Sequence, residues 1–515
     1  MLALSAPPTS LYPALWIGMG GLAWSLDAPI EVKPGGRFRI LEGGGRGLAF
    51  GAAANIVALR FVVATVTQFT ALPAAAAWTA LVLLAVAQGV RWLFAGVAAR
   101  WLASRGVPRW AAFAVGVYAA TFVPAIFPWS PAGGVAPWPA MVQLADLVGE
   151  RGVSALMGLS AGLGAHALRL ALARARPSRP RVKDALRFGV IALLIPVATL
   201  VYGALRMRQV EATRAEAPTA KIALVQPSIG AAFRWDGGHE PAILETLTVL
   251  TRSAEARGAE LTVWPESAYP YSVAHASRFG PIGMYAVLGR GVHGPVLTGM
   301  MMTAGRSESF NSAVLVTSNG ALSPPADKRH LLAFGETVPF SREIPWLRKV
   351  FARGTGLVPG KDPVLLVAGR VRASVLNCFE DTLPEAGREA FEGGPKVSPN
   401  LLVNVTNDAW FAGSTESELH LRLSVLRAVE TRRDLVRSVN LGVTSWVDAT
   451  GRIRARHEGT FAGVLMAEPA LLEGPATVYA QAGDAPWVIV LVGALVLALR
   501  RRAQHTRQNE KGVAP

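Results

Sequence analysis

The sequence is poor in cysteine. Cys378 is the only one in 515 residues. A lone cysteine excludes an intramolecular disulfide and any metal site built on a CxxC pair. The thiol is therefore either a small buried side chain or a reactive group. Composition alone leaves both interpretations open.

Charged residues are also scarce. They make up 17% of the chain against 51% hydrophobic residues, a balance too apolar for one soluble domain. The formal net charge is +16, but Lys and Arg occur in short stretches between apolar segments and do not form one basic domain. This distribution argues against a nucleic-acid partner and favours an integral membrane protein.

Seven apolar segments approach the length of about 20 residues that crosses a bilayer. They lie at about 11–26, 47–69, 74–95, 110–127, 153–173, 187–205 and 485–499. The connections after the first, third and fifth segments are basic, whereas those at 70–73 and 128–149 contain no Lys or Arg. Basic connections are typical of the cytoplasmic side, and the tail after the seventh segment is basic as well. The long segment before the seventh span is therefore expected to be extracytoplasmic.

That long segment has the pattern of an α/β domain. Residues 208–219 are polar and Ala-rich and predict a linker. Short apolar runs then predict strands within 221–226, 259–265, 295–302, 312–320, 370–378, 400–406 and 435–440, with a hairpin over 442–455. Helical patterns at 240–256 and 417–433 interleave with them, which indicates a sheet covered by helices.

The predicted organisation has five parts. A bundle of about six helices is expected over 1–207, followed by the linker at 208–219 and the catalytic domain at 220–478. A final transmembrane helix is expected at 479–500 and a basic cytoplasmic tail at 501–515.

Three residues with catalytic potential stand near predicted strand ends or in a loop of the α/β domain. Glu266 follows Pro265 after one strand, Cys378 ends another, and Lys328 lies in the segment PPADKRHLL. A nucleophilic thiol needs a base, and the tetrahedral intermediate of acyl transfer needs a cation or N–H donors. Taken singly, the three could be a surface carboxylate, a solvated charge and a buried apolar side chain. Together they indicate Cys-dependent acyl transfer.

Four motifs around these residues resemble the nitrilase superfamily. They are WPES at 264–267, DKRHLLAFGETVPF at 327–340, NCFED at 377–381 and NVTNDAWF at 404–411. More narrowly, they are similar to the apolipoprotein N-acyltransferase family. Further similar segments lie at 127–129, 142–154 and 225–236, with AGD before the last helix. The resemblance covers nearly the whole chain.

The resemblance implies a polytopic α-helical membrane bundle with an αββα sandwich as extracytoplasmic domain. It implies Glu266 as general base and acid, Lys328 as oxyanion stabiliser and Cys378 as nucleophile. The acyl donor would be a phospholipid and the acceptor the diacylated N-terminal cysteine of an apolipoprotein. No cofactor and no metal are implied. We expect a monomer in the bacterial inner membrane, with the catalytic domain facing the periplasm.

The resemblance also implies assisting roles for Glu336, Glu380 and Trp235. Glu336 could instead satisfy backbone N–H groups in a turn, and Trp235 could anchor the chain at a membrane interface.

Other polar residues of these motifs have two possible uses. Asn407, Asp408 and Trp410 are expected either to shape the wall facing Cys378 or to form a turn. His420 and Glu430 lie on a predicted helix, where charges form a solvated face or a buried brace.

Two other function classes remain as alternatives. A membrane-tethered amidase would use the same triad, with water accepting the acyl group. A non-catalytic scaffold could keep the fold alone, but it would have no physical reason to retain all three residues. The membrane bundle favours the acyltransferase, because both of its substrates carry lipid.

Overall fold

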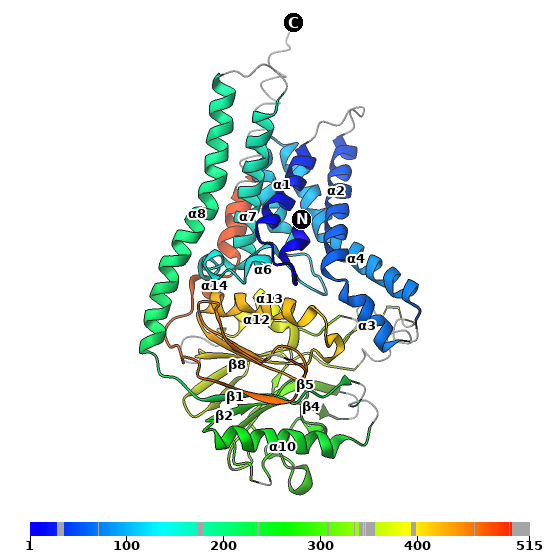
Figure 1. The fold of residues 1–515 in the computed structure, drawn as a ribbon, viewed down its shortest axis with the longest axis vertical. Helices are drawn as coiled ribbons and strands as arrows, with labels where there is room; N and C mark the ends of the chain where they lie inside the picture. The colour runs from blue at the N-terminus through cyan, green and yellow to red at the C-terminus, as the bar shows by residue number, and fades with distance from the viewer. Residues whose placement is uncertain are drawn as a thin grey trace. The chain divides into compact units, whose positions relative to one another are not determined.

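The computed structural model divides the chain into two compact units. One unit comprises Met1–Leu205 and Ala482–Pro515, and the other comprises Arg206–Gln481 (Figure 1). The structure describes residues 1–27, 36–70, 72–173, 179–231, 233, 237–289, 291–305, 308–333, 335–338, 343–344, 346, 356–392, 398–457, 459–493 and 495–496. The predicted tail at 501–515 lies outside the described residues.

The first unit is helical. Its longer helices are α1 (Pro13–Asp27), α2 (Gly36–Ala58), α3 (Phe61–Phe69), α4 (Ala74–Ala103), α5 (Arg109–Ala120), α7 (Ala145–Ala171) and most of α8 (Arg179–Glu216). Among the described residues, α4, α7 and α8 are long and apolar enough to cross a membrane. A fourth span results if α2 and α3, which are bent by 62°, count as one. Helices that are long and apolar enough to span a membrane are thus present in the described residues, and the count of seven spans stays a prediction.

Small residues let two of these helices approach closely. A Cβ atom on Gly47 of α2 would lie 1.9 Å from the carbonyl oxygen of Trp92. A Cβ atom on Gly96 of α4 would lie 2.0 Å from the carbonyl oxygen of Gly43. Glycine is required at both positions because any larger residue would separate the backbones, as is typical of helix pairs in membranes.

Two of the sequence motifs outside the catalytic domain meet in this unit. Arg151, in the 142–154 motif, forms an ion pair with Asp484 of the AGD motif at 2.7 Å. The hydroxyl group of Tyr118 donates to the other oxygen of Asp484 at 3.3 Å. The ion pair therefore ties the start of the last helical segment to α7.

The second unit contains two β-sheets. The first has the order β13-β1-β2-β4-β5-β6, with β3 beside β4, and the second has the order β12-β11-β10-β9-β8-β7. The strands of the first sheet are β1 (Ile222–Gln226), β2 (Leu261–Val263), β3 (Val273–Ala274), β4 (Val296–Ala304), β5 (Glu308–Val316), β6 (Ala326–Asp327) and β13 (Gly463–Ala467). Those of the second are β7 (Leu365–Ala368), β8 (Val371–Asn377), β9 (Leu401–Thr406), β10 (Asp434–Val439), β11 (Ser445–Val447) and β12 (Ile453–Arg456).

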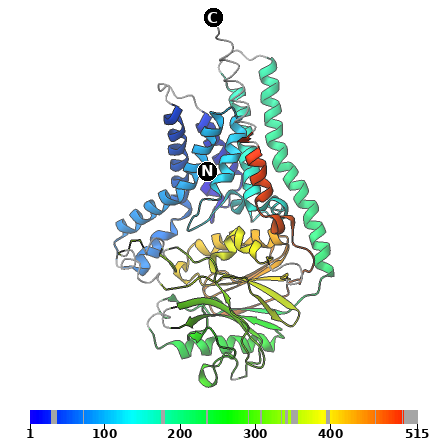
Figure 2. The same ribbon diagram turned by 180° about the vertical axis from the view of Figure 1, so that it is seen from behind.

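The sheets pack against each other between two layers of helix. Helix α10 (Glu240–Ala256) contacts the first sheet, and α12 (Pro384–Glu389) and α13 (Glu416–Thr431) lie over the second (Figure 1). Figure 2 shows the same layers from behind. Alternation along β1 explains the arrangement, since Ile222 and Leu224 enter the core between the sheets while Val225 packs under α10. The predicted α/β architecture is confirmed.

Each predicted strand and both predicted helices of this unit are present. The hairpin is formed by the antiparallel pair β11 and β12. The sequence patterns did not reveal the short strands β3, β6, β7 and β13.

The structure does not have the linker that the sequence predicted at 208–219. Helix α8 continues through most of this segment and ends at Glu216. Ala, Glu, Arg and Gln in this stretch are good helix formers. The guanidinium group of Arg214 also donates to Asp434 Oδ1 at 2.9 Å and Oδ2 at 2.7 Å. Helix propensity and this paired contact hold the segment in regular structure.

Candidate active site

Glu266 stands on a tight turn after β2. Trp264 before it is buried and donates to Thr251 at 2.8 Å, and Ser267 after it has a φ of 47°. The turn passes directly over β4, where a Cβ atom on Gly299 would lie 2.4 Å from the Ser267 nitrogen. Glycine on the neighbouring strand therefore lets the Glu266 turn reach its position.

Cys378 stands at the end of β8, in the first position of the 3-10 turn Cys378–Thr382. Its φ of 55° is left-handed, a conformation that non-glycine residues adopt rarely. Strands β8, β9 and β10 are parallel, so their carboxyl ends share one edge of the second sheet. The sulfur is thus presented at the edge where α/β domains place reactive groups.

Lys328 follows β6, and β5 positions it. Its backbone N–H donates to the carbonyl oxygen of Asn311 at 2.8 Å, continuing the pairing of β5 with β6. Its side chain is almost fully buried, with 2% of the residue exposed. A buried ammonium group needs charged partners, and two carboxylates provide them.

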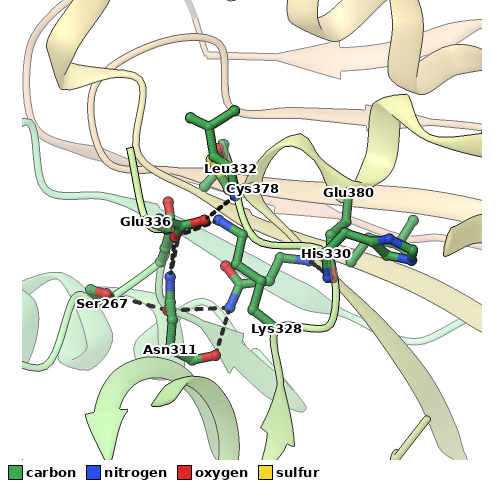
Figure 3. Close-up of polar contacts among 12 residues, drawn as sticks. Ser267, Asn311, Lys328, His330, Leu332, Glu336, Cys378 and Glu380 are labelled. Carbon is green, nitrogen blue, oxygen red and sulfur yellow. Dashed lines mark hydrogen bonds and ion pairs between the residues drawn. The ribbon is translucent and has the colours of Figure 1, made fainter. Parts of the chain in front are cut away.

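These partners are Glu266 and Glu336. The Lys328 Nζ atom lies 3.2 Å from Glu266 Oε1 and 2.8 Å from Glu336 Oε1. The other oxygen of Glu336 accepts the Leu332 N–H at 2.9 Å. In Figure 3 the Lys328 and Glu336 side chains point toward one another, with Cys378 next to them. The structure thus brings the predicted residues together.

Asn311 on β5 joins the two carboxylates from the opposite side. Its Nδ2 atom donates to Glu266 Oε1 at 2.8 Å and to Glu336 Oε1 at 3.2 Å. Its own Oδ1 accepts from Asn377 Nδ2 at 3.2 Å, beside the nucleophile turn (Figure 3). Asn311 is not among the residues that the sequence motifs predicted for the site. The available signal was an amide within the apolar strand ESFNSAVLV, at a position that proves to be buried.

The electrostatics of the site keep the cation charged and the thiol neutral. Burial alone would lower the pKa of Lys328, but Glu266, Cys378 and Glu336 together raise it above its ordinary value. Burial, followed by Glu266, raises the pKa of the Cys378 thiol well above its ordinary value, although Lys328 opposes this shift. The raised pKa favours the protonated form of the resting sulfur.

Glu380 connects the Cys378 turn to the Lys328 segment. Its Oε2 accepts the Asn377 N–H at 2.7 Å, and its Oε1 accepts the N–H groups of Arg329 and His330 at 2.8 and 2.9 Å. Burial raises the pKa of Glu380, and the hydrogen bonds from these backbone groups act in the opposite direction. These three bonds hold the backbone at Asn377, Arg329 and His330, and none of them involves the Cys378 sulfur.

The remaining residues named from the sequence have different surroundings. Asn407 Oδ1 accepts from the Ala409 N–H at 3.2 Å and from Asn440 Nδ2 at 2.9 Å, as expected of a turn former. Trp410 is 38% exposed. Trp235 lies outside the described residues, so its predicted role stays a prediction.

Asp408 and His420 belong to a buried ion-pair network, at 3.2 Å from each other. Glu430 is likewise buried and pairs with Arg427 at 3.0 Å. His420 and Glu430, the two residues predicted on this helix, are therefore buried in ion pairs and do not form a solvated face. Together with Glu416, Asp408 and His420 place three ligand-type atoms within 4.8 Å of one another. Both ring nitrogens of His420 pair with aspartates, Nε2 with Asp381 and Nδ1 with Asp408. The positive charge that faces these carboxylates is therefore the imidazole ring itself.

Comparison with known proteins covers both units. The carbon-nitrogen hydrolase family model matches residues 221–471, and the model of the apolipoprotein N-acyltransferase N-terminal domain matches residues 1–163. The matched ranges correspond to the two-sheet unit and to most of the helical unit.

Curated relatives match over most of their own length. An apolipoprotein N-acyltransferase from Geobacter metallireducens is 32% identical over 400 residues, which is 75% of this chain and 73% of that protein. One from Allorhizobium ampelinum is 28% identical over 479 residues, covering 88% of this chain and 84% of that protein. One from Haemophilus ducreyi is 27% identical over 462 residues, covering 88% and 86%. With both domains matched and such coverage, the chain belongs to the apolipoprotein N-acyltransferase family.

Proposed function

We propose that this membrane acyltransferase moves an acyl chain from a phospholipid, through a thioester on Cys378, to an apolipoprotein. The acceptor is the α-amino group of the diacylglyceryl-modified N-terminal cysteine. The observation that carries the proposal is the buried Lys328 ammonium group, held by Glu266 and Glu336 beside the strand end that presents Cys378 (Figure 3).

In the first half-reaction the Cys378 sulfur attacks the ester carbonyl carbon of the phospholipid. Glu266 accepts the thiol proton, which the raised pKa of Cys378 keeps on the sulfur until attack. The Lys328 ammonium group stabilises the oxyanion of the tetrahedral intermediate. When the intermediate collapses, the carbon–oxygen bond breaks and Glu266 returns the proton to the leaving alcohol. A lysophospholipid departs and an acyl thioester remains.

In the second half-reaction the lipoprotein amine attacks the thioester carbonyl. Glu266 accepts the proton of the amine, and Lys328 again faces the oxyanion. Collapse breaks the carbon–sulfur bond, returns the proton to the sulfur and releases an N-acylated lipoprotein. Glu266 carries the proton in each step, Lys328 stabilises the oxyanion and Cys378 carries the acyl group. The proposed steps therefore require no cofactor.

Mass spectrometry of the purified protein with phospholipid but without acceptor tests the first half. We expect an added acyl mass on the peptide containing Cys378. An acyl mass on another residue, or none, would overturn the thioester mechanism.

Adding a diacylated lipopeptide tests the second half. Transfer of the acyl chain to its amino terminus is expected, with loss of the mass on Cys378. The competing function is an amidase-type hydrolase, in which water takes the acyl group. Release of free fatty acid without N-acylation would establish that alternative.

We further propose a monomer in the bacterial inner membrane with the catalytic unit in the periplasm. The alternation of basic connections in the sequence supports this orientation. A fluorescent protein fused after Pro515 should fluoresce, since the tail is expected in the cytoplasm, whereas alkaline phosphatase fused there should be inactive. Light scattering in detergent should give the mass of one chain.

A further inference from the structure

The turn that carries Cys378 needs support beyond its own sequence. A non-glycine residue with left-handed backbone persists only where its surroundings over-determine it. Glu380 provides one restraint through the Asn377 N–H. Asn404 on β9 provides another, because its Nδ2 atom donates to the carbonyl oxygens of Leu376 at 2.9 Å and of Cys378 at 2.8 Å.

A third restraint acts through Asp381, three residues after the nucleophile. Asp381 is fully buried in the same 3-10 turn. Its Oδ1 lies 2.8 Å from Nε2 of His420 on α13, and its Oδ2 lies 3.2 Å from Nε of Arg437 on β10. The turn is thus held between the helix layer and the second sheet by two cationic groups.

Arg437 also reaches the turn by a second route. Its Nε atom lies 3.3 Å from Asn404 Oδ1, and Asn404 in turn donates to the Cys378 carbonyl oxygen. Its Nη1 atom donates to Ser424 Oγ at 3.2 Å, which fixes the guanidinium group against α13. Arg437 therefore restrains the turn both at Asp381 and at the nucleophile backbone.

The charges within this cluster balance. Burial would lower the pKa of His420, but Asp381 and Asp408 raise it, to about 10. The Glu416 carboxyl group, in contrast, has a pKa raised to about 8 by burial and by Asp408. At neutral pH two cations, His420 and Arg437, thus face two aspartates. Removing one member leaves an uncompensated buried charge, which is strongly unfavourable.

We propose that Asp381, His420 and Arg437 form a positioning clamp that holds the Cys378 turn in its reactive conformation. The three residues act through the turn and do not touch the substrate. This inference rests on Cys378 being the nucleophile, as set out under the proposed function. The clamp sets the rate of attack by the sulfur and leaves phospholipid binding unchanged.

The test uses the purified full-length protein in detergent. The rate of acyl-thioester formation on Cys378 is measured by intact mass against phosphatidylethanolamine concentration, together with the melting temperature. We expect His420→Gln and Asp381→Asn to lower the maximal rate at least 10-fold. The half-saturating lipid concentration should change less than threefold.

Two further variants keep the result interpretable. Ser424→Ala preserves every charge and removes the hydrogen bond to Arg437 together with the local bond from the Ser424 hydroxyl group to the Leu421 carbonyl oxygen, so it should fold even if Asp381→Asn does not. Its maximal rate should fall two- to fivefold. Arg214→Gln removes two other buried ion pairs of the same unit, with Asp434 and Asp448, and serves as the matched control. It should lower the melting temperature and leave the maximal rate within twofold of wild type.

The outcomes separate the two proposals. If the wild-type protein acquires no acyl group on Cys378, the proposed function fails and the clamp fails with it. If the wild type is acylated and the folded clamp variants react at the wild-type maximal rate, only the clamp is overturned. A higher half-saturating concentration at an unchanged maximal rate would also overturn it, because that result indicates lost lipid binding.

Discussion

The ammonium nitrogen of Lys328 lies 2.8 Å from Glu336 Oε1, while the other oxygen of Glu336 accepts the Leu332 N–H. Glu336 therefore orients the cation through one oxygen and the following loop through the other. Glu336→Gln keeps an oxygen for Leu332 but loses the charge facing Lys328. We expect kcat to fall about 10- to 100-fold, as for the loss of one electrostatic element of an active site.

The measurement is N-acylation of a diacylated lipopeptide at saturating phospholipid. Glu392→Gln is the control, because Glu392 pairs with Arg388 on the surface of the same unit. That variant should keep the wild-type rate. An undiminished kcat in Glu336→Gln would show that the Lys328 position does not depend on this contact.

Cys378→Ala should abolish acyl transfer completely. The substitution removes the sulfur proposed to form the thioester and deletes one heavy atom from a half-buried position. We expect a melting temperature within a few degrees of wild type and no product in the lipopeptide assay. Measurable turnover by the folded variant would exclude the covalent mechanism.

The pH dependence of thiol alkylation should report the two charges beside the sulfur. Because Cys378 is the only cysteine, iodoacetamide labelling measures this thiolate alone. Burial and Glu266 raise the pKa of Cys378, whereas Lys328 lowers it. Glu266→Gln should therefore move the alkylation midpoint to lower pH, and Lys328→Met should move it to higher pH. Shifts of the opposite sign would contradict this charge arrangement.

Gly299→Ala should displace Glu266, the proposed base. The added Cβ atom would meet the Ser267 nitrogen at 2.4 Å and the Pro265 carbonyl oxygen at 2.6 Å, so the Glu266 turn must shift. We expect a loss of unfolding free energy of about 1–3 kcal/mol, the usual cost of overpacking, and at least a 10-fold lower kcat.

Gly280→Ala is the comparison for that variant, since its Cβ atom would find no atom closer than 3.6 Å. It should retain both stability and activity. Equal effects in the two variants would mean that close contact with the Glu266 turn is not the cause. Thermal unfolding and the lipopeptide assay check both.

Local patterns were enough to predict the strands that carry the site. The apolar runs at 259–265 and 370–378 predicted β2 and β8, and a catalytic candidate follows the last residue of each strand, Glu266 three positions after Val263 and Cys378 directly after Asn377. The reason is physical, because a strand that is covered on both faces carries a nearly continuous apolar run, and such a run is visible in the sequence. Strands β7 and β13 lie at the edges of their sheets, and most of their positions are partly exposed, so their burial pattern is weaker.

Pairing between strands could not be predicted in the same way. Asn311 and Lys328 are adjacent because β5 and β6 are antiparallel, and no periodicity in the sequence specifies that register. The polar segment before β1 was misjudged for another reason. Its helix is stabilised by Arg214 contacting Asp434, a residue 220 positions later in the chain.

Glu380 has a mechanical consequence for the site. One carboxylate holds the backbone at Asn377, next to the nucleophile, and at Arg329 and His330, next to the cation. Thermal motion of either segment therefore carries the other with it. The separation between the Cys378 sulfur and the Lys328 ammonium group is thus coupled to one carboxylate and depends less on the motion of either segment alone.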